Sequence, residues 1–185
     1  NSFGSTAIAG YSAGMRIESL SIVPMLAMGN AMSTFTAQNM GAGKIDRVKK
    51  GYRMCYVIVL TAGAVLCVMY QLAGGAFVSL FLDSGSSEAY SVGLSYVKFL
   101  SFFYSFIGLK ASTDGLLRGA GDVTAFTVAN LVNLAIRVSV TNLFAPIYGI
   151  QVAWMAVPLG WAANYVISFG WYLTGKWKKI RVIKK

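Results

Sequence analysis

The sequence predicts an all-α polytopic membrane protein with five membrane-spanning helices. Of its 185 residues, 56% are hydrophobic and only 12% are charged, whereas soluble domains carry about 25% charged residues. The net charge is +10, from 16 Lys and Arg against 6 Asp and Glu. The basic residues cluster beside long apolar stretches, which is typical of the inner face of a membrane rather than of a nucleic-acid-binding domain.

The first half of the chain contains two apolar stretches, each longer than the ~20 residues that a bilayer crossing needs. The first predicted span, about 5–39, ends at Gly41-Ala42-Gly43, and the second covers about 54–82. Closely spaced glycines interrupt helices and mark turns. The polar run Asp83-Ser84-Gly85-Ser86-Ser87 separates the second span from the third, at about 91–117.

The second half repeats this pattern. A Gly-Ala-Gly break at 119–121 ends the third span, and the fourth, about 123–145, stops next to Pro146. The fifth covers about 148–175 and leads into a basic tail. Because the connections are short, successive spans are predicted to be antiparallel neighbours in a single membrane domain covering 1–185.

The charges of the connections predict how the spans cross the membrane. The loop 40–53 and the C-terminal tail are strongly basic, whereas Asp83 and Glu88 lie in a connection without basic residues. Basic loops stay in the cytoplasm. We therefore expect the loop 40–53, the turn 118–122 and the tail on the cytoplasmic side of the plasma membrane, and the N-terminus outside.

The chain begins with Asn1 and shows no signal peptide. A membrane protein whose N-terminus lies outside the cell ordinarily needs a segment that directs the N-terminus across the membrane. We therefore expect a fragment, with at least one further helix before Asn1.

Glu18 is the acidic residue that we expect deepest in the membrane. It lies about 13 residues into the first span, or roughly 20 Å at 1.5 Å per residue, past the middle of a hydrocarbon core of about 30 Å. An ionisable residue there is a candidate functional site, because one carboxylate can hold either a proton or an organic cation. Arg16 is a second candidate, although it lies about 200° round the helix from Glu18. The alternative is that both pair with other helices to hold the bundle together.

Lys110 and Asp114 are four residues apart, on one face of the third span. Asp114 lies only about 7 Å from the predicted end of the helix, where a charged side chain can extend to water. This position favours a gate or a structural ion pair over direct substrate binding.

A polar stripe follows the fourth span, where Asn130, Asn133, Arg137 and Thr141 recur at three- and four-residue steps. Such a stripe faces a watery cavity, or else supplies hydrogen bonds between helices. In the first span, Pro24 removes a backbone hydrogen bond. It is a candidate hinge for alternating access, although a fixed bend is the commoner role.

Three segments resemble the multidrug and toxic compound extrusion (MATE) family. They are RIESLSIVPMLAMGNAMSTFTAQNMGAGKIDRVKKGYR at 16–53, GLLRGAGD at 115–122 and IYGIQVAWMAVPLGW at 147–161. The family's order is kept, and the resemblance covers essentially the whole chain.

The resemblance implies two six-helix lobes around a central cavity, of which this chain is most of the C-terminal lobe, helices eight to twelve of twelve. It implies export of organic cations or other amphipathic compounds in exchange for protons or sodium. The partners implied are the lipid bilayer, the missing N-terminal lobe with the helix preceding this chain, and a small-molecule substrate. No cofactor beyond the coupling ion and no nucleic acid are expected.

The chain also departs from the family pattern. Several members carry an acidic residue in the seventh helix, which this chain does not include. Others carry one in the middle of the tenth, about 11 residues before the LRG arginine, where this sequence has Ile107. The sequence therefore lacks the residue that would serve as a sodium-binding carboxylate of that type.

Two other functions remain open. One is a lipid-linked saccharide flippase of the same wider superfamily, for which we expect a more cationic cavity. The other is a membrane interaction module that transports nothing. No enzyme, catalytic residue or metal site is expected, because the sequence has no histidine and shows no nucleophile paired with a base.

Overall fold

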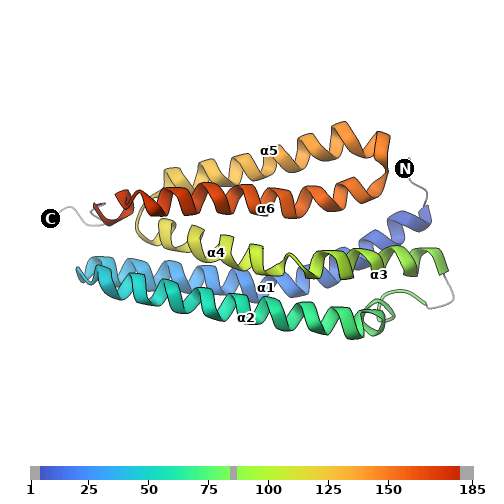
Figure 1. Ribbon diagram of the computed structural model, residues 1–185, viewed down its shortest axis with the longest axis horizontal. Helices are drawn as coiled ribbons and strands as arrows, with labels where there is room; N and C mark the ends of the chain where they lie inside the picture. The colour runs from blue at the N-terminus through green and yellow to red at the C-terminus, as the bar shows by residue number, and fades with distance from the viewer. Residues whose placement is uncertain (1–4, 84–86, 180–185) are drawn as a thin grey trace.

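The computed structural model describes residues 5–83 and 87–179, and these residues form a bundle of α-helices (Figure 1). The four helices that are by themselves long and apolar enough to cross a membrane are α1, α2, α5 and α6; α3 and α4 together pass the same test as a pair bent by 51°. The described chain therefore holds up to five spans. The helices are α1 (Ser5–Gly41), α2 (Ile45–Val78), α3 (Ser87–Ser101), α4 (Tyr104–Gly119), α5 (Val123–Tyr148) and α6 (Ile150–Leu173), followed by the 3-10 turn η1 (Lys176–Lys179).

The helices lie side by side along the long axis of the molecule (Figure 1). The α1–α2 turn, the α4–α5 turn and η1 lie at one end, and the start of α1 and the α5–α6 turn lie at the other. Helix α1 packs against α4, α3 and α2, while α5 packs on α6, and α6 packs on α4. The bundle thus consists of a larger group of helices and an α5–α6 hairpin, which is attached mainly through α6.

Both Gly-Ala-Gly breaks end a helix with the same backbone hydrogen bonds. At the end of α1, the N–H of Lys44 donates to the carbonyl of Asn39 at 2.8 Å. The N–H of Gly43 donates to the carbonyl of Met40 at 3.0 Å. Gly43 has φ of +69°, and Gly121 at the end of α4 has φ of +85°, a left-handed conformation that glycine adopts without steric cost. This explains why the chain turns at these two places.

The segment predicted as one span over 91–117 is not a continuous helix, because α3 ends at Ser101 and α4 begins at Tyr104. The carbonyl of Lys98, next to the break, accepts hydrogen bonds from Gln71 Nε2 of α2 at 2.9 Å and from the Ser101 hydroxyl at 2.7 Å. A side chain that bonds into the backbone ladder is a recognised cause of a helix kink. A residue of another helix therefore binds the backbone beside the bend.

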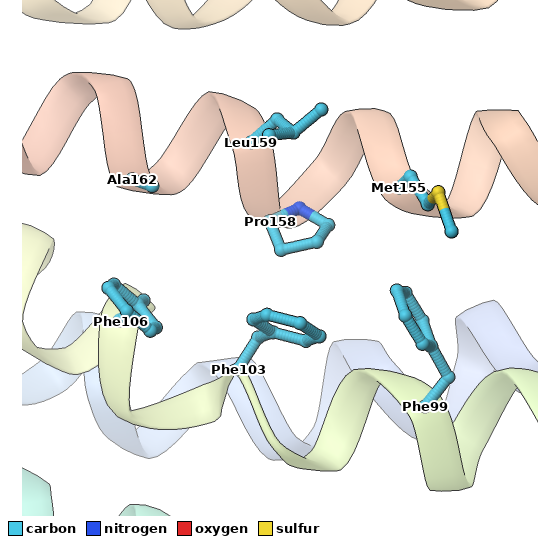
Figure 2. A pocket seen from close by; sticks show the side chains of 7 residues that line it. All are labelled: Phe99, Phe103, Phe106, Met155, Pro158, Leu159 and Ala162. Atoms are coloured by element: carbon cyan, nitrogen blue, oxygen red, sulfur yellow. The ribbon is translucent and has the colours of Figure 1, made fainter.

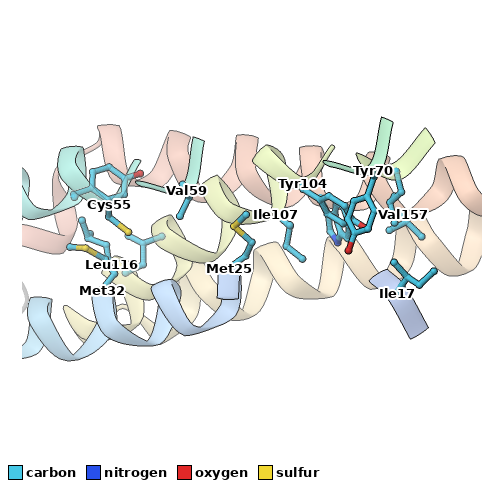
Figure 3. Packing of buried hydrophobic residues seen from close by; sticks show 14 of the residues in the cluster. Ile17, Met25, Met32, Cys55, Val59, Tyr70, Tyr104, Ile107, Leu116 and Val157 are labelled. Atoms are coloured by element: carbon cyan, nitrogen blue, oxygen red, sulfur yellow. The ribbon is translucent and has the colours of Figure 1, made fainter. Parts of the chain in front are cut away.

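An apolar core fills the space between α1, α2, α4 and α6 (Figure 3). Met25 and Met32 of α1 are 1% and 3% exposed, and they belong to the same cluster as Val59, Ile107 and Val157. Buried side chains from four helices hold these helices in fixed positions relative to one another. The charged side chains described below are therefore attached to a rigid frame.

Helices α1 and α4 approach each other closely because small residues lie where they meet. A Cβ atom placed on Gly29 would lie 2.6 Å from the carbonyl oxygen of Ala111, and one on Gly115 would collide with the backbone of Gly29. Small residues that allow backbones to touch are typical of helix contacts in membranes. This contact lies beside the polar cavity described next.

Candidate transport site

Glu18, on α1, is buried against α3. Its residue is 9% exposed, and its Oε2 accepts a short hydrogen bond from the hydroxyl of Tyr96. A burial of this kind requires a partner, because an unpaired carboxylate in a low-dielectric interior is strongly unfavourable. The sequence pointed to Glu18 by its depth alone, and nothing in it indicated Tyr96, 78 residues further along the chain.

Aromatic rings surround this carboxylate. Tyr96 makes edge contacts with Tyr11, at 5.0 Å between ring centroids, and with Trp154 of α6, at 5.5 Å. The indole Nε1 of Trp154 is buried and has no hydrogen-bond partner within the described chain. Arg137 of α5 is close enough to act electrostatically on both Tyr11 and Glu18. Residues of α1, α3, α5 and α6 therefore meet around one acidic group.

Arg16 lies away from this group. Its side chain is exposed on α1, whereas Glu18, two residues later, is buried. Within the described residues, no ion pair joins the two. The structure thus brings Arg137, and not Arg16, close to the carboxylate, as the angle between positions 16 and 18 on a helix requires.

Lys110 and Asp114 form a buried ion pair on α4. The distance from Lys110 Nζ to Asp114 Oδ2 is 3.0 Å, and the two side chains are 12% and 6% exposed. Asn130 of α5 accepts from Lys110 at 3.1 Å and donates to Asp114 at 3.3 Å. Ser168 of α6 donates to Asp114 Oδ1 at 2.6 Å. The pair thus joins three helices and has the hydrogen bonds that a buried ion pair needs.

The ion pair borders a polar cavity of about 270 Å³ between α1, α4 and α5. On its α1 side, Asn30 accepts from Arg118 at 2.7 Å, and the Arg118 guanidinium lies 5.6 Å from the centre of the Phe126 ring. The cavity is lined by Leu26, Gly29, Asn30, Lys110, Ala111, Asp114, Gly115, Arg118, Phe126 and Asn130. It is the place where the Lys110–Asp114 pair and the GLLRGAGD segment meet.

The polar residues of the α5 stripe have different neighbours in the structure. Asn130 belongs to the ion-pair network, and Arg137 is exposed, with only a weak electrostatic influence on Glu18. Asn133 lies close to Gly160 of α6, and its Oδ1 is buried without a hydrogen-bond partner in the described chain. Of the three, Asn130 both forms hydrogen bonds between helices and lines the cavity beside the ion pair; a cavity role for Asn133 and Arg137 stays a prediction.

Pro24 lies inside α1, which continues as a helix from Ser5 to Gly41. Its side chain is exposed, and the next residue, Met25, is in the core. Ile107, the residue in place of the family's acidic group, is also buried in the core. The structure thus shows where both residues lie; whether Pro24 is a hinge stays a prediction.

A hydroxyl cluster near Asp114 was not anticipated from the sequence. The Thr113 hydroxyl lies 2.8 Å from the hydroxyls of both Tyr52 and Tyr56 of α2, and Tyr56 donates to Tyr165 of α6 at 3.3 Å. Tyr52 and Tyr56 are four residues apart and so share one face of α2. This spacing is visible in the sequence and indicates a shared face, but it does not show which helix that face contacts.

A second, apolar cavity of about 280 Å³ lies between the α3–α4 break and α6 (Figure 2). Phe99, Phe103 and Phe106 form one wall, and Pro158 and Leu159 belong to the other. Its lining has almost no polar atoms. It therefore offers contact area to an apolar group, and its aromatic rings are the only lining groups that could attract a cation.

No group of three or more His, Cys, Asp or Glu in the described residues is arranged to hold a metal ion. The charged groups of the site are the Glu18 carboxylate, with Arg137 nearby, and the Lys110–Asp114 pair. A bundle of membrane-length helices with such groups between them has the architecture of a membrane transporter lobe.

The family follows from the sequence comparison. Residues 1–156 match the MatE family model, and the chain therefore belongs to the MATE family. It is 28% identical over 183 residues to the "Probable multidrug resistance protein YpnP" of Bacillus subtilis, covering 98% of this chain and 41% of that protein. It is 22% identical to the "Probable multidrug resistance protein NorM" of Thermotoga maritima, covering 98% of this chain and 39% of that protein.

Solved structures share the fold. One is described as an inward-facing multidrug resistance MATE family transporter of the MOP superfamily, with a TM-score of 0.82 and 18% identity over 91% of this chain and 38% of that one. Another is described as MATE in the bent conformation. Its TM-score is 0.81 and its sequence identity 18%, over 94% of this chain and 39% of that one. The chain therefore spans about 40% of the length of the relatives it matches.

Proposed function

We propose that this chain is most of one lobe, the C-terminal one, of a MATE exporter. The complete transporter would move organic cations or other amphipathic compounds out of the cell in exchange for protons or sodium, by alternating access. Membership of the MatE family and likeness to proteins named for multidrug resistance support export. The observation that carries the coupling proposal is the buried Glu18 carboxylate bound to Tyr96.

Glu18 would be the site where the coupling ion and the substrate compete. A carboxylate in a mostly apolar environment is stable when it holds a proton, a metal cation or an organic cation. The rings of Tyr11, Tyr96 and Trp154 nearby would contact the apolar part of an amphipathic substrate. The positive charge of Arg137 would stabilise the ionised carboxylate and weaken its attraction for a bound cation, which would help release.

The Lys110–Asp114 pair would act as a gate close to one end of the bundle. Within the described residues, its bonds are to α4, α5 and α6. A movement of the α5–α6 hairpin would therefore have to break or exchange those to α5 and α6. A movement of this kind is what alternating access requires. Pro24 would let α1 adjust its direction during that movement, because it lacks one backbone hydrogen bond.

We further propose that the end of the bundle containing the α1–α2 turn, the α4–α5 turn and η1 faces the cytoplasm, in the plasma membrane. These segments lie at the same end (Figure 1), and the first and last are basic. Single cysteines at Lys44 and Glu88, introduced into a background without Cys55 and Cys67, would test this. A membrane-impermeant maleimide added to intact cells should label position 88 and not position 44; the opposite result would reverse the topology.

The decisive experiment measures ethidium efflux from cells expressing the complete transporter, with the proton and sodium gradients collapsed in turn. Export should stop when one of the two gradients is lost. Glu18→Gln should abolish gradient-driven export without lowering the amount of protein in the membrane. The matched control is Glu88→Gln, which neutralises an exposed glutamate in the first turn of α3 and should leave export unchanged.

Two results would contradict the proposal. Export by Glu18→Gln cells at the parent rate would show that Glu18 is structural. Absence of export of any tested cation, with normal amounts of protein in the membrane, would instead favour the lipid-linked saccharide flippase or the interaction module.

A further inference from the structure

A positively charged hollow lies at the end of the bundle where α1 turns into α2. Its volume is about 650 Å³, and it is formed by the α1–α2 turn together with a residue of η1. The hollow is lined by Gly43, Lys44, Ile45, Asp46, Arg47, Lys49 and Lys178. It is separate from the Glu18 group and from the Lys110–Asp114 cavity, which share no lining residue with it.

The charges of the hollow are not balanced. Four of its side chains are basic and one is acidic. Asp46 pairs with Lys49 at 2.8 Å, and in the part of the chain that the structure describes no salt bridge involves Lys44, Arg47 or Lys178. An excess of positive charge gathered around a concave surface favours an anionic ligand.

The protein holds Lys178 beside the hollow. Trp177, the residue before it, is fully buried, and its indole Nε1 donates to the carbonyl of Tyr172 at 3.1 Å. The Nζ of Lys178 lies 5.7 Å from the centre of the Trp177 ring, a distance at which cation and ring attract. A cation from η1 thus lies opposite those of the α1–α2 turn.

The start of α2 adds further positive character. Its N-cap residue is Lys44, which makes no side-chain capping bond. The first N–H groups of this helix are therefore not satisfied by a side-chain oxygen, unlike those of α5, where Asp122 caps the helix. The partial positive charge of an uncapped N-terminus adds to that of the four basic side chains.

The hollow lies next to an exposed apolar part of α2. Met54 and Val57 are 60% and 58% exposed, as expected for side chains that contact lipid tails. Met54 is about 10 Å along the helix from Arg47 at 1.5 Å per residue. The headgroup layer on each side of the hydrocarbon core is about 5–8 Å thick. With Met54 inside the hydrocarbon core, Arg47 lies at or just beyond the outer edge of this layer, so an anion held in the hollow would be within reach of the headgroups.

We propose that this hollow binds the phosphate group of an anionic phospholipid. Lys44, Arg47 and Lys178 provide the charge, and the apolar surface of α2 lies beside the lipid's acyl chains. Basic pockets at the ends of membrane helices bind acidic headgroups in this way. The site is distinct from the proposed transport site and does not depend on which compound is exported.

The experiment uses the complete protein in nanodiscs of phosphatidylcholine containing a small amount of photoactivatable phosphatidylglycerol. The site variant is Lys44→Gln, Arg47→Gln and Lys178→Gln together. The control variant is Lys50→Gln, Arg53→Gln and Lys176→Gln, which removes the same charge from the same helix and η1 but from residues outside the hollow. We expect cross-linking of phosphatidylglycerol to fall by about tenfold or more in the site variant and by less than about twofold in the control.

Further measurements make each outcome decisive. The conservative variant Lys44→Arg, Arg47→Lys and Lys178→Arg should keep cross-linking near the parent level, which separates loss of charge from loss of folding. Equal losses in the site and control variants would overturn the proposal and show a general surface-charge effect. Displacement of the lipid probe by inorganic phosphate would also overturn it, because the hollow would then be a site for a soluble anion.

Discussion

The hydroxyl of Tyr96 on α3 donates a hydrogen bond to the carboxylate of Glu18 on α1. It is the contact through which the candidate coupling residue is held by the bundle, because the ring of Tyr96 is itself fixed between Tyr11 and Trp154. The position of Glu18 therefore depends on three helices.

Replacing Tyr96 by Phe should impair coupled export while the bundle stays folded. The substitution keeps the ring contacts and removes only the donor, and a hydrogen bond to a charged group contributes about 1.5–3 kcal/mol. We expect ethidium export to fall by roughly tenfold or more. Tyr90→Phe, on the same helix but outside this cluster, is the control. If both variants export at the parent rate, Tyr96 has no part in the function of Glu18.

The Lys110–Asp114 pair should show strong coupling in a double-mutant cycle. Lys110→Met or Asp114→Leu alone leaves one buried charge without its partner, which costs about 3–5 kcal/mol. The double variant replaces the pair by apolar groups and should recover most of that stability. Denaturant unfolding of the purified transporter would measure the cycle. Additive losses in the double variant would show that the two charges do not depend on each other.

The double variant also tests the gate. If the pair serves transport, Lys110→Met with Asp114→Leu should fold and still export poorly, because the bonds exchanged with Asn130 and Ser168 are lost. Ethidium efflux at equal protein levels is the measurement. Parent-like export would identify the pair as purely structural.

Gly115→Ala should destabilise the transporter. The added methyl group would collide with the backbone of Gly29, and overpacking of this kind costs about 1–3 kcal/mol. The matched control is Gly170→Ala in α6, where a Cβ atom meets nothing within 4 Å. Replacing a helical glycine there should be neutral, or stabilising by about 0.5–1 kcal/mol. Melting temperatures of the two variants in the same detergent would decide; equal melting temperatures would contradict the close contact of α1 and α4.

Asp122→Ala should weaken the start of α5. Asp122 accepts from the N–H of Ala125 at 3.3 Å and from the indole N–H of Trp171 at 2.8 Å. Loss of an N-cap costs about 0.5–2 kcal/mol, and the unpaired indole adds to this. Trp171→Phe removes only the second bond, so it should lose less stability than Asp122→Ala. The reverse order in denaturant unfolding would show that the cap contributes little.

The helical fold and the places where the chain turns could be predicted from the sequence. Composition and the length of the apolar stretches indicate membrane-spanning helices, and the two Gly-Ala-Gly breaks are the positions where Gly43 and Gly121 adopt positive φ. These features are local, because a turn or an apolar helix is set by residues close together in the chain. The break between α3 and α4 could not be predicted, because Gln71, on α2, bonds to the carbonyl beside it.

For the candidate site, the sequence by itself identified Glu18 as an acidic residue far inside an apolar stretch and placed Lys110 and Asp114 close to the end of another. Depth along a helix follows from counting residues from its end. Only the tertiary structure decided their partners, since Tyr96, Asn130 and Ser168 bind them from other helices. Helical periodicity tells which residues share a face, but not which helix that face meets. That choice was made by the packing of small and large side chains between helices, as at Gly29 and Gly115.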